Sequence, residues 1–550
     1  MKAREEEKKA ERMAVVADAE TSAAERRVRT TARHLVGIQT QACAAIGATE
    51  ESAAVAMAVG GSGQSEEDDP YAIEQDFVDL DGIDEIPLVG TDVDLSEDYV
   101  AGLNMMAQRC HPETKLGYVD TIESGHILMV TKPASVRKVL TSSVQHFLGG
   151  LRPPSAAFFG HKVLFILEGK EWLDLRNVLK KSFQKHNVGL MSEDMAWAAE
   201  GFDAILNKYA QSGEDLDFMR AVGAFHLNAI AKVSFDYDIG AIEGFEDGEH
   251  PIEESFEYLL EELPRRSYAP DWETQNDFES DNEDNRNMAK YSWQARDVIR
   301  TVIRKRLAEI EAGATPRGDL LQKMIDVYTE DYPEARGDEE MLTAELGDNL
   351  VEIMFAGYNT AVPTSAHALF LLANYPEYAQ RVKEEVDTVL QGRRPTMDDI
   401  KSLKFCERVY MEALRLFPPA SLIARQTTKD VELDGMIIPR ATRVWLPACA
   451  IHRDADSWED PMVFNPDRFA SKIVRGSFIP FSDGPRNCAG RNFAMYEGIT
   501  ALATVFAKYD VSVNESFDHS TVFTGFGLRP FDFNTARVCM RLNVHPRQDL

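Results

Sequence analysis

One cysteine near the C-terminus stands among residues that suit a metal-bound thiolate. The run from Phe481 to Gly490 reads FSDGPRNCAG and places Cys488 between a glycine-containing turn and a predicted helix start. Amides at a helix start stabilise a thiolate, and Arg486 can pair with a carboxylate of the bound group. Gly484 permits a tight turn, Gly490 lets a flat group approach the backbone, and Phe481 would shield the sulfur from water. The alternative is a buried structural cysteine beside an ordinary loop.

A second unusual pattern lies in the apolar segment 346–372, which has helical periodicity. Its middle reads AGYNTAVP and includes a proline. Pro363 cannot donate an amide to the carbonyl of Asn359, so we expect the helix to open or kink there. The small pair Ala356 and Gly357 lets another group approach the backbone closely. The alternative is a kinked core helix that packs tightly on a neighbour.

Together the two patterns resemble the cytochrome P450 family. FxxGxRxCxG is similar to the family's haem-binding signature, and AGxxT is similar to its oxygen-activation helix. The resemblance implies a haem b cofactor, Cys488 as the axial ligand of the iron, and Thr360 as a hydrogen-bond donor during oxygen activation. It also implies catalytic positions at Ala356, Gly357 and Asn359.

The chain departs from the family at Asn359, where the usual residue is an acid. An amide can hold a water molecule but cannot deliver a proton by ionising. We therefore expect slower or rerouted proton delivery, or chemistry that needs less of it. Glu352 is a candidate substitute acid or a partner for a polar or cationic substrate group; a salt bridge to the segment that covers the site is the alternative.

Charged residues on either side of the 418–463 stretch predict a scaffold for the cysteine loop. Glu412 and Arg415 stand three residues apart on one helix face, and Arg468 lies in the run FNPDRF. Taken alone, such a pair is a surface ion pair worth less than about 1 kcal/mol. The three residues resemble the family's ExxR and PERF elements, which implies a buried structural cluster behind the haem.

The two haem propionates require cations and hydrogen-bond donors. Trp172 and Arg176 lie four residues apart on a predicted helix and resemble the family's WxxxR pattern. Arg425 and Arg486 are the other candidates. His452, in the run AIHRD, is interpreted as a propionate or structural contact.

The remaining patterns predict a mainly α fold with small β-sheets. Residues 116–130 are typical of a β-hairpin, and a short β pattern covers 430–447. Helical patterns cover 171–185, 192–209, 218–236, 251–262, 286–312, 341–373, 375–391 and 402–416. The resemblance covers residues 85–545 as one catalytic domain.

Residues 1–80 are predicted to be an N-terminal extension that is partly disordered. They are rich in Ala, Glu, Lys and Arg and end in the run GGSGQSEEDD, which has the composition of a linker.

The composition restricts the partners and the location. The net charge of −32 argues against nucleic acid, and six scattered cysteines show no disulfide or zinc spacing. No stretch of 18 apolar residues is present, and the glutamates among the first dozen residues argue against a signal peptide. We expect a cytoplasmic or peripherally membrane-associated protein.

The resemblance implies a monooxygenase that inserts one oxygen atom from O2 into a small apolar substrate, by hydroxylation or epoxidation. Only 62 residues (550 − 488) follow Cys488, so we expect a separate NADPH-dependent flavoprotein reductase or ferredoxin. Basic residues that could dock it are Lys180, Lys181, Lys185, Arg475 and Arg491. Phe355, Phe523 and Phe526 indicate an apolar pocket. The alternatives are a haem-thiolate isomerase or peroxygenase that needs no reductase, and a non-catalytic haem sensor or carrier.

Overall fold

The computed structural model describes residues 86–89, 99–121, 125–141, 147–149, 154–182, 188–267, 280–315, 317–514, 521–524, 527–530 and 539–548. The predicted extension, 1–80, lies outside the described residues, as do Lys185 and Phe526 and the side chains of Lys181 and Phe523.

Several long helices begin at a residue whose side chain caps the first turn. The Asp217 carboxylate accepts a hydrogen bond of 3.0 Å from the amide of Met219 at the start of α8 (Phe218–Phe235). Asn282, Asp319 and Asp338 cap α11 (Glu283–Glu311), α12 (Leu320–Asp331) and α13 (Glu339–Asn374) in the same way. Such caps satisfy amides that have no partner within the helix, so these starts are fixed locally by the sequence.

The mainly α architecture is confirmed, and within the described residues each of the eight predicted helical patterns overlaps a helix. Besides those named above, the α-helices are α3 (Tyr99–Gln108), α4 (Pro133–Thr141), α5 (Pro154–Phe159), α6 (Gly169–Ser182), α7 (Val188–Ser212), α9 (Pro251–Ser267), α14 (Pro376–Leu390), α15 (Met397–Ile400), α16 (Lys404–Leu416), α17 (Ala448–Ile451) and α18 (Arg491–Lys508). Short 3-10 helices are η3 (Pro333–Ala335) and η4 (Pro466–Ala470).

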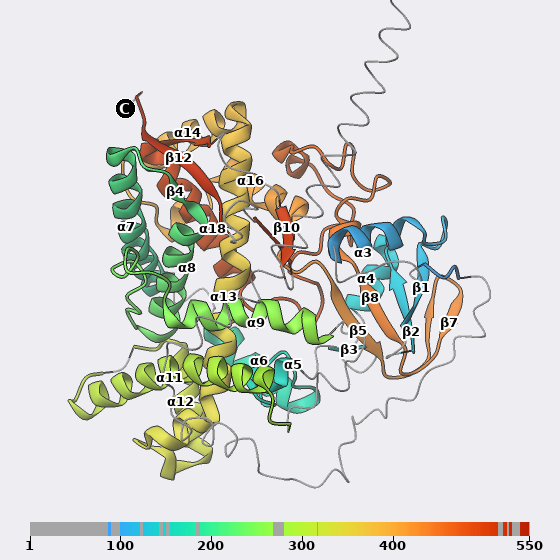
Figure 1. Ribbon diagram of the computed structural model, residues 1–550, viewed down its shortest axis with the longest axis horizontal. Helices are drawn as coiled ribbons and strands as arrows, with labels where there is room; N and C mark the ends of the chain where they lie inside the picture. Colours follow the sequence, from blue (N-terminus) through green and yellow to red (C-terminus); the bar gives the residue numbers. More distant parts are fainter. Residues whose placement is uncertain are drawn as a thin grey trace, which may run out of the picture.

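The largest sheet lies to one side of the helices (Figure 1) and has the strand order β1-β2-β8-β5-β3. The predicted hairpin forms β1 (Leu116–Thr121) and β2 (Gly125–Val130), with Leu116 opposite Val130. The 430–447 pattern contains β6 (Val431–Leu433), β7 (Met436–Ile438) and β8 (Arg443–Leu446). Among the described strands, β2 and β8 are the pair that runs parallel. The other strands are β3 (Phe147–Gly149), β4 (Leu216–Asp217), β5 (Ile423–Thr427), β9 (Tyr509–Val513), β10 (Thr521–Thr524), β11 (Gly527–Pro530) and β12 (Arg541–Pro546).

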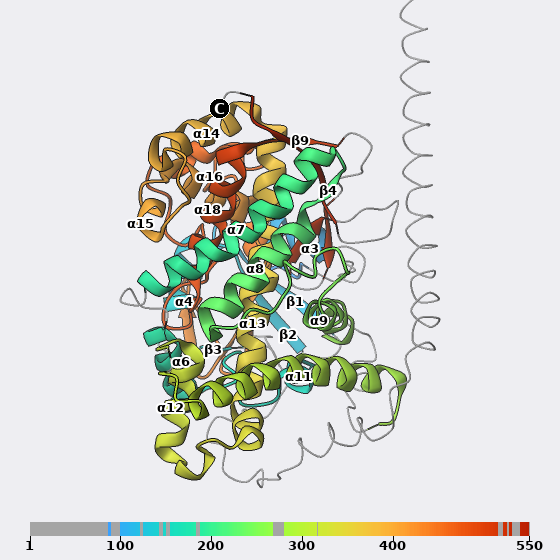
Figure 2. The same cartoon turned by 90° about the vertical axis from the view of Figure 1, so that its left-hand side faces the viewer.

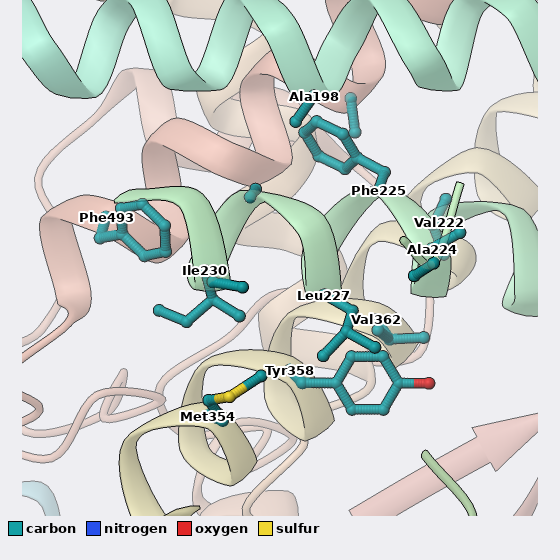
Figure 3. Packing of buried hydrophobic residues seen from close by; sticks show 14 of the residues in the cluster. Ala198, Val222, Ala224, Phe225, Leu227, Ile230, Met354, Tyr358, Val362 and Phe493 are labelled. Atoms are coloured by element: carbon teal, nitrogen blue, oxygen red, sulfur yellow. The ribbon is translucent and has the colours of Figure 1, made fainter. Parts of the chain in front are cut away.

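Helix α13 runs through the middle of the helical part, where both views place it among α8, α11, α16 and α18 (Figures 1 and 2), and it contacts all four. Its buried face meets α8 in the main hydrophobic core. Figure 3 shows Met354, Tyr358 and Val362 of α13 packed against Leu227 and Ile230 of α8.

The structure differs from the predicted opening of this helix at Pro363. α13 continues as an α-helix through the proline to Asn374. The Thr364 hydroxyl donates a 2.8 Å hydrogen bond to the Thr360 carbonyl, and the neighbouring helices hold α13 on several sides. Because proline has no amide hydrogen, the carbonyl of Asn359 lacks its usual helical hydrogen-bond donor. The helix nevertheless does not end there.

Candidate functional site

The cysteine loop ends at the N-terminus of α18, as the sequence predicts. Gly490 is the residue before the helix, and the backbone amides of Gly490 and Arg491 bond to the Cys488 sulfur. The Cys488 amide in turn donates a 2.9 Å hydrogen bond to the Phe481 carbonyl. The loop thus directs two helix-start amides at the sulfur, the arrangement that favours a thiolate.

Gly484 and Gly490 serve different purposes in this loop. Gly484 has φ +71°, and a Cβ there would lie 2.1 Å from the carbonyl oxygen of Leu140. Only glycine fits that turn. A Cβ at Gly490 would meet nothing within 4 Å, so its outer side faces open space where a flat group can lie.

The groups around Cys488 suit a thiolate that binds a metal ion. The side chain is accessible, yet it lies deep enough that burial raises the pKa of its thiol, against the Gly490 amide and the charges of Arg176 and Arg491, which lower it. A bound metal cation reverses this balance, because a coordinating thiol loses its proton outright. The residues present therefore fit a thiolate bound to iron.

Arginines predicted to meet the propionates gather beside the loop. Arg425 is half-buried, and burial together with the charge of Arg486 lowers its pKa to about 10, while Glu168 opposes that change. Two half-buried guanidinium groups near each other favour the binding of anions. The side chain of Arg486 donates a 3.0 Å hydrogen bond to the Leu167 carbonyl, which fixes its position.

The WxxxR pair of α6 contacts the cysteine loop. The Trp172 ring is buried under the Arg486 guanidinium, 4.5 Å from its centroid. Arg176 donates a 2.6 Å hydrogen bond to the Asn487 side chain, next to Cys488. The indole supports Arg486, and Arg176 ties α6 to the cysteine loop.

Phe481 and His452 were also predicted at the cofactor. Phe481 is half-buried, with the Arg491 guanidinium 5.6 Å from its ring centroid. His452 has no accessible surface, and its Nε2 accepts a 2.9 Å hydrogen bond from the amide of Ile479. A side chain with no accessible surface cannot reach a bound propionate, so that part of the prediction is wrong, and His452 braces the start of the loop.

The charged trio forms one buried cluster. Both oxygens of Glu412 accept hydrogen bonds from Arg415, at 2.7 and 2.8 Å, and Oε1 also accepts one of 2.9 Å from Arg468. Arg415 further donates to the carbonyls of His452 and Pro461. A buried charge pair is tolerable only with such complete pairing. The cluster fastens α16 to the segment that precedes the cysteine loop.

On α13 the AGxxT residues point in different directions. Thr360 is exposed although most of the surrounding helix is buried, and its hydroxyl donates a 2.9 Å hydrogen bond to the carbonyl of Ala356. A Cβ at Gly357 would lie 2.9 Å from the side chain of Ile230. The close approach predicted for Gly357 is therefore a helix–helix contact with α8, which corrects its assignment to the catalytic set.

Asn359 is buried, and neither atom of its side-chain amide has a hydrogen-bond partner among the described residues. Buried amides are nearly always hydrogen-bonded in folded proteins. The side chain therefore suits a bound water molecule, as the sequence analysis expects of it.

Glu352 is hydrogen-bonded to backbone rather than to a cation. Its carboxylate accepts hydrogen bonds from the amides of Leu164 (2.8 Å) and Phe165 (2.6 Å), and no ion pair to it occurs in the described part of the chain. Burial raises its pKa to about 8, although the two amides oppose the change. It fastens the segment after α5 to α13 through these backbone hydrogen bonds, and not through the salt bridge that the sequence analysis gave as the alternative.

A cluster of aromatic side chains lies next to the contact between Glu352 and the segment after α5. The Phe355 ring centroid lies 5.1 Å from that of Phe159 and 5.4 Å from that of Phe256, and Phe165 lies 6.3 Å from Phe159. The sequence analysis missed Phe159, Phe165 and Phe256, because a single aromatic residue in a helix or loop does not indicate which other aromatic side chains it will contact.

Comparison with known proteins supports the same assignment. The family model for cytochrome P450 matches residues 86–533. The chain belongs to the cytochrome P450 family. Cytochrome P450 3A7 of Homo sapiens is 28% identical over 393 residues, which cover 70% of this chain and 76% of that protein. Cytochrome P450 3A12 of Canis lupus familiaris is 26% identical over 445 residues, covering 77% and 84%.

Membership of the cytochrome P450 family makes this chain a monooxygenase that binds haem b. The cysteine loop, its amides and the neighbouring arginines fit that group. Among the described residues of this cytochrome P450, we find no helix with the length and apolar character needed to cross a membrane.

Proposed function

We propose that this monooxygenase inserts one oxygen atom from O2 into a small apolar substrate, by hydroxylation or epoxidation. The observation that supports this most is the cysteine loop, where the amides of Gly490 and Arg491 face the Cys488 sulfur beside Arg176.

We assign the cofactor contacts as follows. Cys488 would hold the haem iron through its thiolate, and Arg425, Arg486 and Arg176 would supply the positive charge that the propionates need. The bound haem supplies the oxygen chemistry, with thiolate donation favouring cleavage of the O–O bond. Thr360 donates a hydrogen bond on the substrate side, and Asn359 holds a water molecule that it cannot itself protonate. Residues 85–545 act as one catalytic domain.

Electrons come from a separate reductase or ferredoxin in this proposal. Lys180, Arg475 and Arg491 are exposed, and Arg491 follows the cysteine by three residues. On a protein of net charge −32, exposed basic side chains can attract an acidic partner, and their effect weakens as salt screens it.

The first test is the reduced, carbon-monoxide-bound difference spectrum of the purified protein beside Cys488→Ser. We expect a strongly red-shifted Soret band that the variant lacks. A band at the wavelength typical of a neutral axial ligand in the wild type would contradict thiolate ligation.

The second test separates the monooxygenase from the isomerase or peroxygenase alternatives. Apolar compounds are screened with a flavoprotein reductase, NADPH and 18O2. We expect reductase-dependent product that carries one labelled oxygen. Product formed equally well without reductase, or without label, would overturn the proposal.

A further inference from the structure

An irregular segment connects α5 to α6 and contacts both α13 and the cysteine loop. It consists of residues 160–168, which we call the strap, and it forms no helix or strand. The side chains of Val163 and Ile166 anchor it in the protein interior. Backbone groups that are withdrawn from water need hydrogen-bond partners, and a segment without secondary structure must find many of them on other elements.

Side chains of α13 supply such partners in the middle of the strap. The Glu352 carboxylate accepts hydrogen bonds from the amides of Leu164 (2.8 Å) and Phe165 (2.6 Å). One turn earlier on the same face of α13, Asn349 donates a 2.9 Å hydrogen bond to the Lys162 carbonyl. Both α13 side chains are buried. The helix therefore holds the strap by its backbone, whatever side chains the strap carries.

A close contact at Gly160 adds to this attachment at the start of the strap. Gly160 has φ +86°, and a Cβ there would lie 1.9 Å from a carboxylate oxygen of Asp348 on α13. Asp348 is held in turn by a 2.7 Å hydrogen bond from Arg296 on α11. Only a glycine fits beside a carboxylate that is fixed in this way.

The far end of the strap contacts both arginines that we assign to the haem propionates. The Leu167 carbonyl accepts the 3.0 Å hydrogen bond from Arg486. Burial lowers the pKa of Arg425 to about 10, and the negative charge of Glu168 opposes that change, so Glu168 lies near this second arginine. The strap therefore runs from α13 to the cofactor arginines.

A closed turn links the two attachments. The amides of Ile166 and Leu167 both donate to the Val163 carbonyl, at 3.0 and 2.9 Å. The two amides held by Glu352 lie inside this turn, and Leu167, which binds Arg486, ends it. Because hydrogen bonds close the turn, its attachment to α13 and the position of the Leu167 carbonyl are coupled.

We propose that Glu352 and Asn349 position Arg486 for the haem propionates by holding the strap against α13. The Leu167 carbonyl binds one N–H group of Arg486, and the Trp172 ring supports the guanidinium, 4.5 Å from the ring centroid. A guanidinium held at two points presents its remaining N–H groups in one orientation, which favours paired hydrogen bonds to a carboxylate. Neither Glu352 nor Asn349 touches the cofactor, so both are positioning residues.

Hydrogen exchange of the holoprotein, read by mass spectrometry on peptides that cover the strap, tests the attachment. Glu352→Gln keeps one acceptor oxygen and replaces the other by an NH2 group, which cannot accept a hydrogen bond. We expect exchange in the strap to be about tenfold faster or more in Glu352→Gln, and faster in Asn349→Ala. Exchange at the wild-type rate in Glu352→Gln would overturn the proposal.

Glu385→Gln is the matched control for Glu352→Gln. Glu385 lies on α14 and also accepts hydrogen bonds from two consecutive amides, those of Phe405 (2.7 Å) and Cys406 (2.9 Å) on α16. This variant removes the same kind of contact without touching the strap, so we expect wild-type exchange there. Equally fast strap exchange in both variants would mean that general loosening of the protein, and not the Glu352 contact, is measured.

Transfer of haem from the holoprotein to excess apomyoglobin tests the effect on the cofactor. We expect haem loss to be several-fold faster in Glu352→Gln and in Asn349→Ala, and unchanged in Glu385→Gln. Arg486→Ala removes the side chain through which the strap acts, so Glu352→Gln should add little to haem loss in that background. A full additional effect there would show that Glu352 acts by another route and would refute the proposal.

This inference rests on the proposed role of Arg486, which Arg486→Ala tests by itself. Haem loss at the wild-type rate in Arg486→Ala would contradict that role, and the inference with it. Faster loss in Arg486→Ala, with wild-type loss in both Glu352→Gln and Asn349→Ala, would refute the positioning role alone. Each variant must show the red-shifted carbon-monoxide band before its haem loss is measured, so that only thiolate-bound haem is counted.

Discussion

At the scale of single residues, the complete hydrogen bonding of Glu412 determines how much this residue contributes to the free energy of unfolding. Its carboxylate accepts hydrogen bonds from Arg415, Arg468 and the amide of Asn465. Glu412→Gln leaves buried guanidinium groups unpaired, so we expect a loss of about 3–5 kcal/mol in the free energy of unfolding, measured by urea titration, and weaker retention of haem.

The exposed pair of Arg394 and Glu200 is the control for that measurement. Both hydrogen bonds between them are as short as those of Glu412, at 2.7 and 2.8 Å, yet both side chains are more than half exposed. Glu200→Gln is expected to cost less than about 1 kcal/mol. Equal losses for the two variants would contradict the role given to burial.

The buried carboxyl of Glu352 predicts a pH dependence. Its pKa is raised from 4.5 to about 8, so the folded protein holds this proton where the unfolded chain has lost it. The stabilising contribution is present at low pH and is lost as the pH rises through about 8. We expect the unfolding free energy of the wild type, relative to Glu352→Gln, to fall by roughly 2–4 kcal/mol between about pH 5 and pH 9. A difference that rises with pH would show that the two amides outweigh burial.

At the scale of elements, the loop before α18 predicts opposite effects for its two glycines. Gly484→Ala adds a Cβ 2.1 Å from the Leu140 carbonyl oxygen at a positive φ, so we expect a destabilisation of at least about 1–3 kcal/mol. Gly490→Ala meets no protein atom, so the apoprotein should unfold at an unchanged temperature while haem affinity falls. Thermal unfolding of the apoprotein, beside haem titration, checks both. Unchanged haem affinity in Gly490→Ala would mean that the open side of Gly490 is not where the haem lies.

The long helix α13 shows how neighbouring elements override a local rule. Pro363 predicts an opening or a kink, yet the chain stays helical because α8, α11, α16 and α18 hold it on several sides. The contact with α8 also explains why position 357 is a glycine, since Ile230 occupies the space that a side chain there would need.

At the scale of the whole molecule, the match to the family begins at residue 86, as do the described residues. We expect a chain that lacks residues 1–80 to retain the carbon-monoxide difference band and a melting temperature close to that of the full chain. The measurements are the difference spectrum and calorimetry on both proteins. Loss of the haem band in the shortened chain would show that the catalytic unit extends further towards the N-terminus than 85–545.

Short-range chemistry was enough for the sequence to determine the family, the cysteine loop and the mainly α fold. The residues from Phe481 to Gly490 are adjacent in the chain, so their types and spacing already specify a turn, a helix start and a thiolate. Glu412 and Arg415 lie on one helix face for the same reason. The helical periodicity predicted the long helices because the apolar face of each helix is formed by residues that are close together in the sequence.

Only the tertiary structure decided which distant residues meet. The Leu140 carbonyl fills the space beside Gly484, and the backbone of Leu164 and Phe165 binds Glu352. None of these pairs has a periodic or spaced signature, since their contacts depend on how whole helices and loops pack. Burial follows from that packing, and burial raises the pKa of Glu352, so the acid–base behaviour of this side chain is decided by the fold.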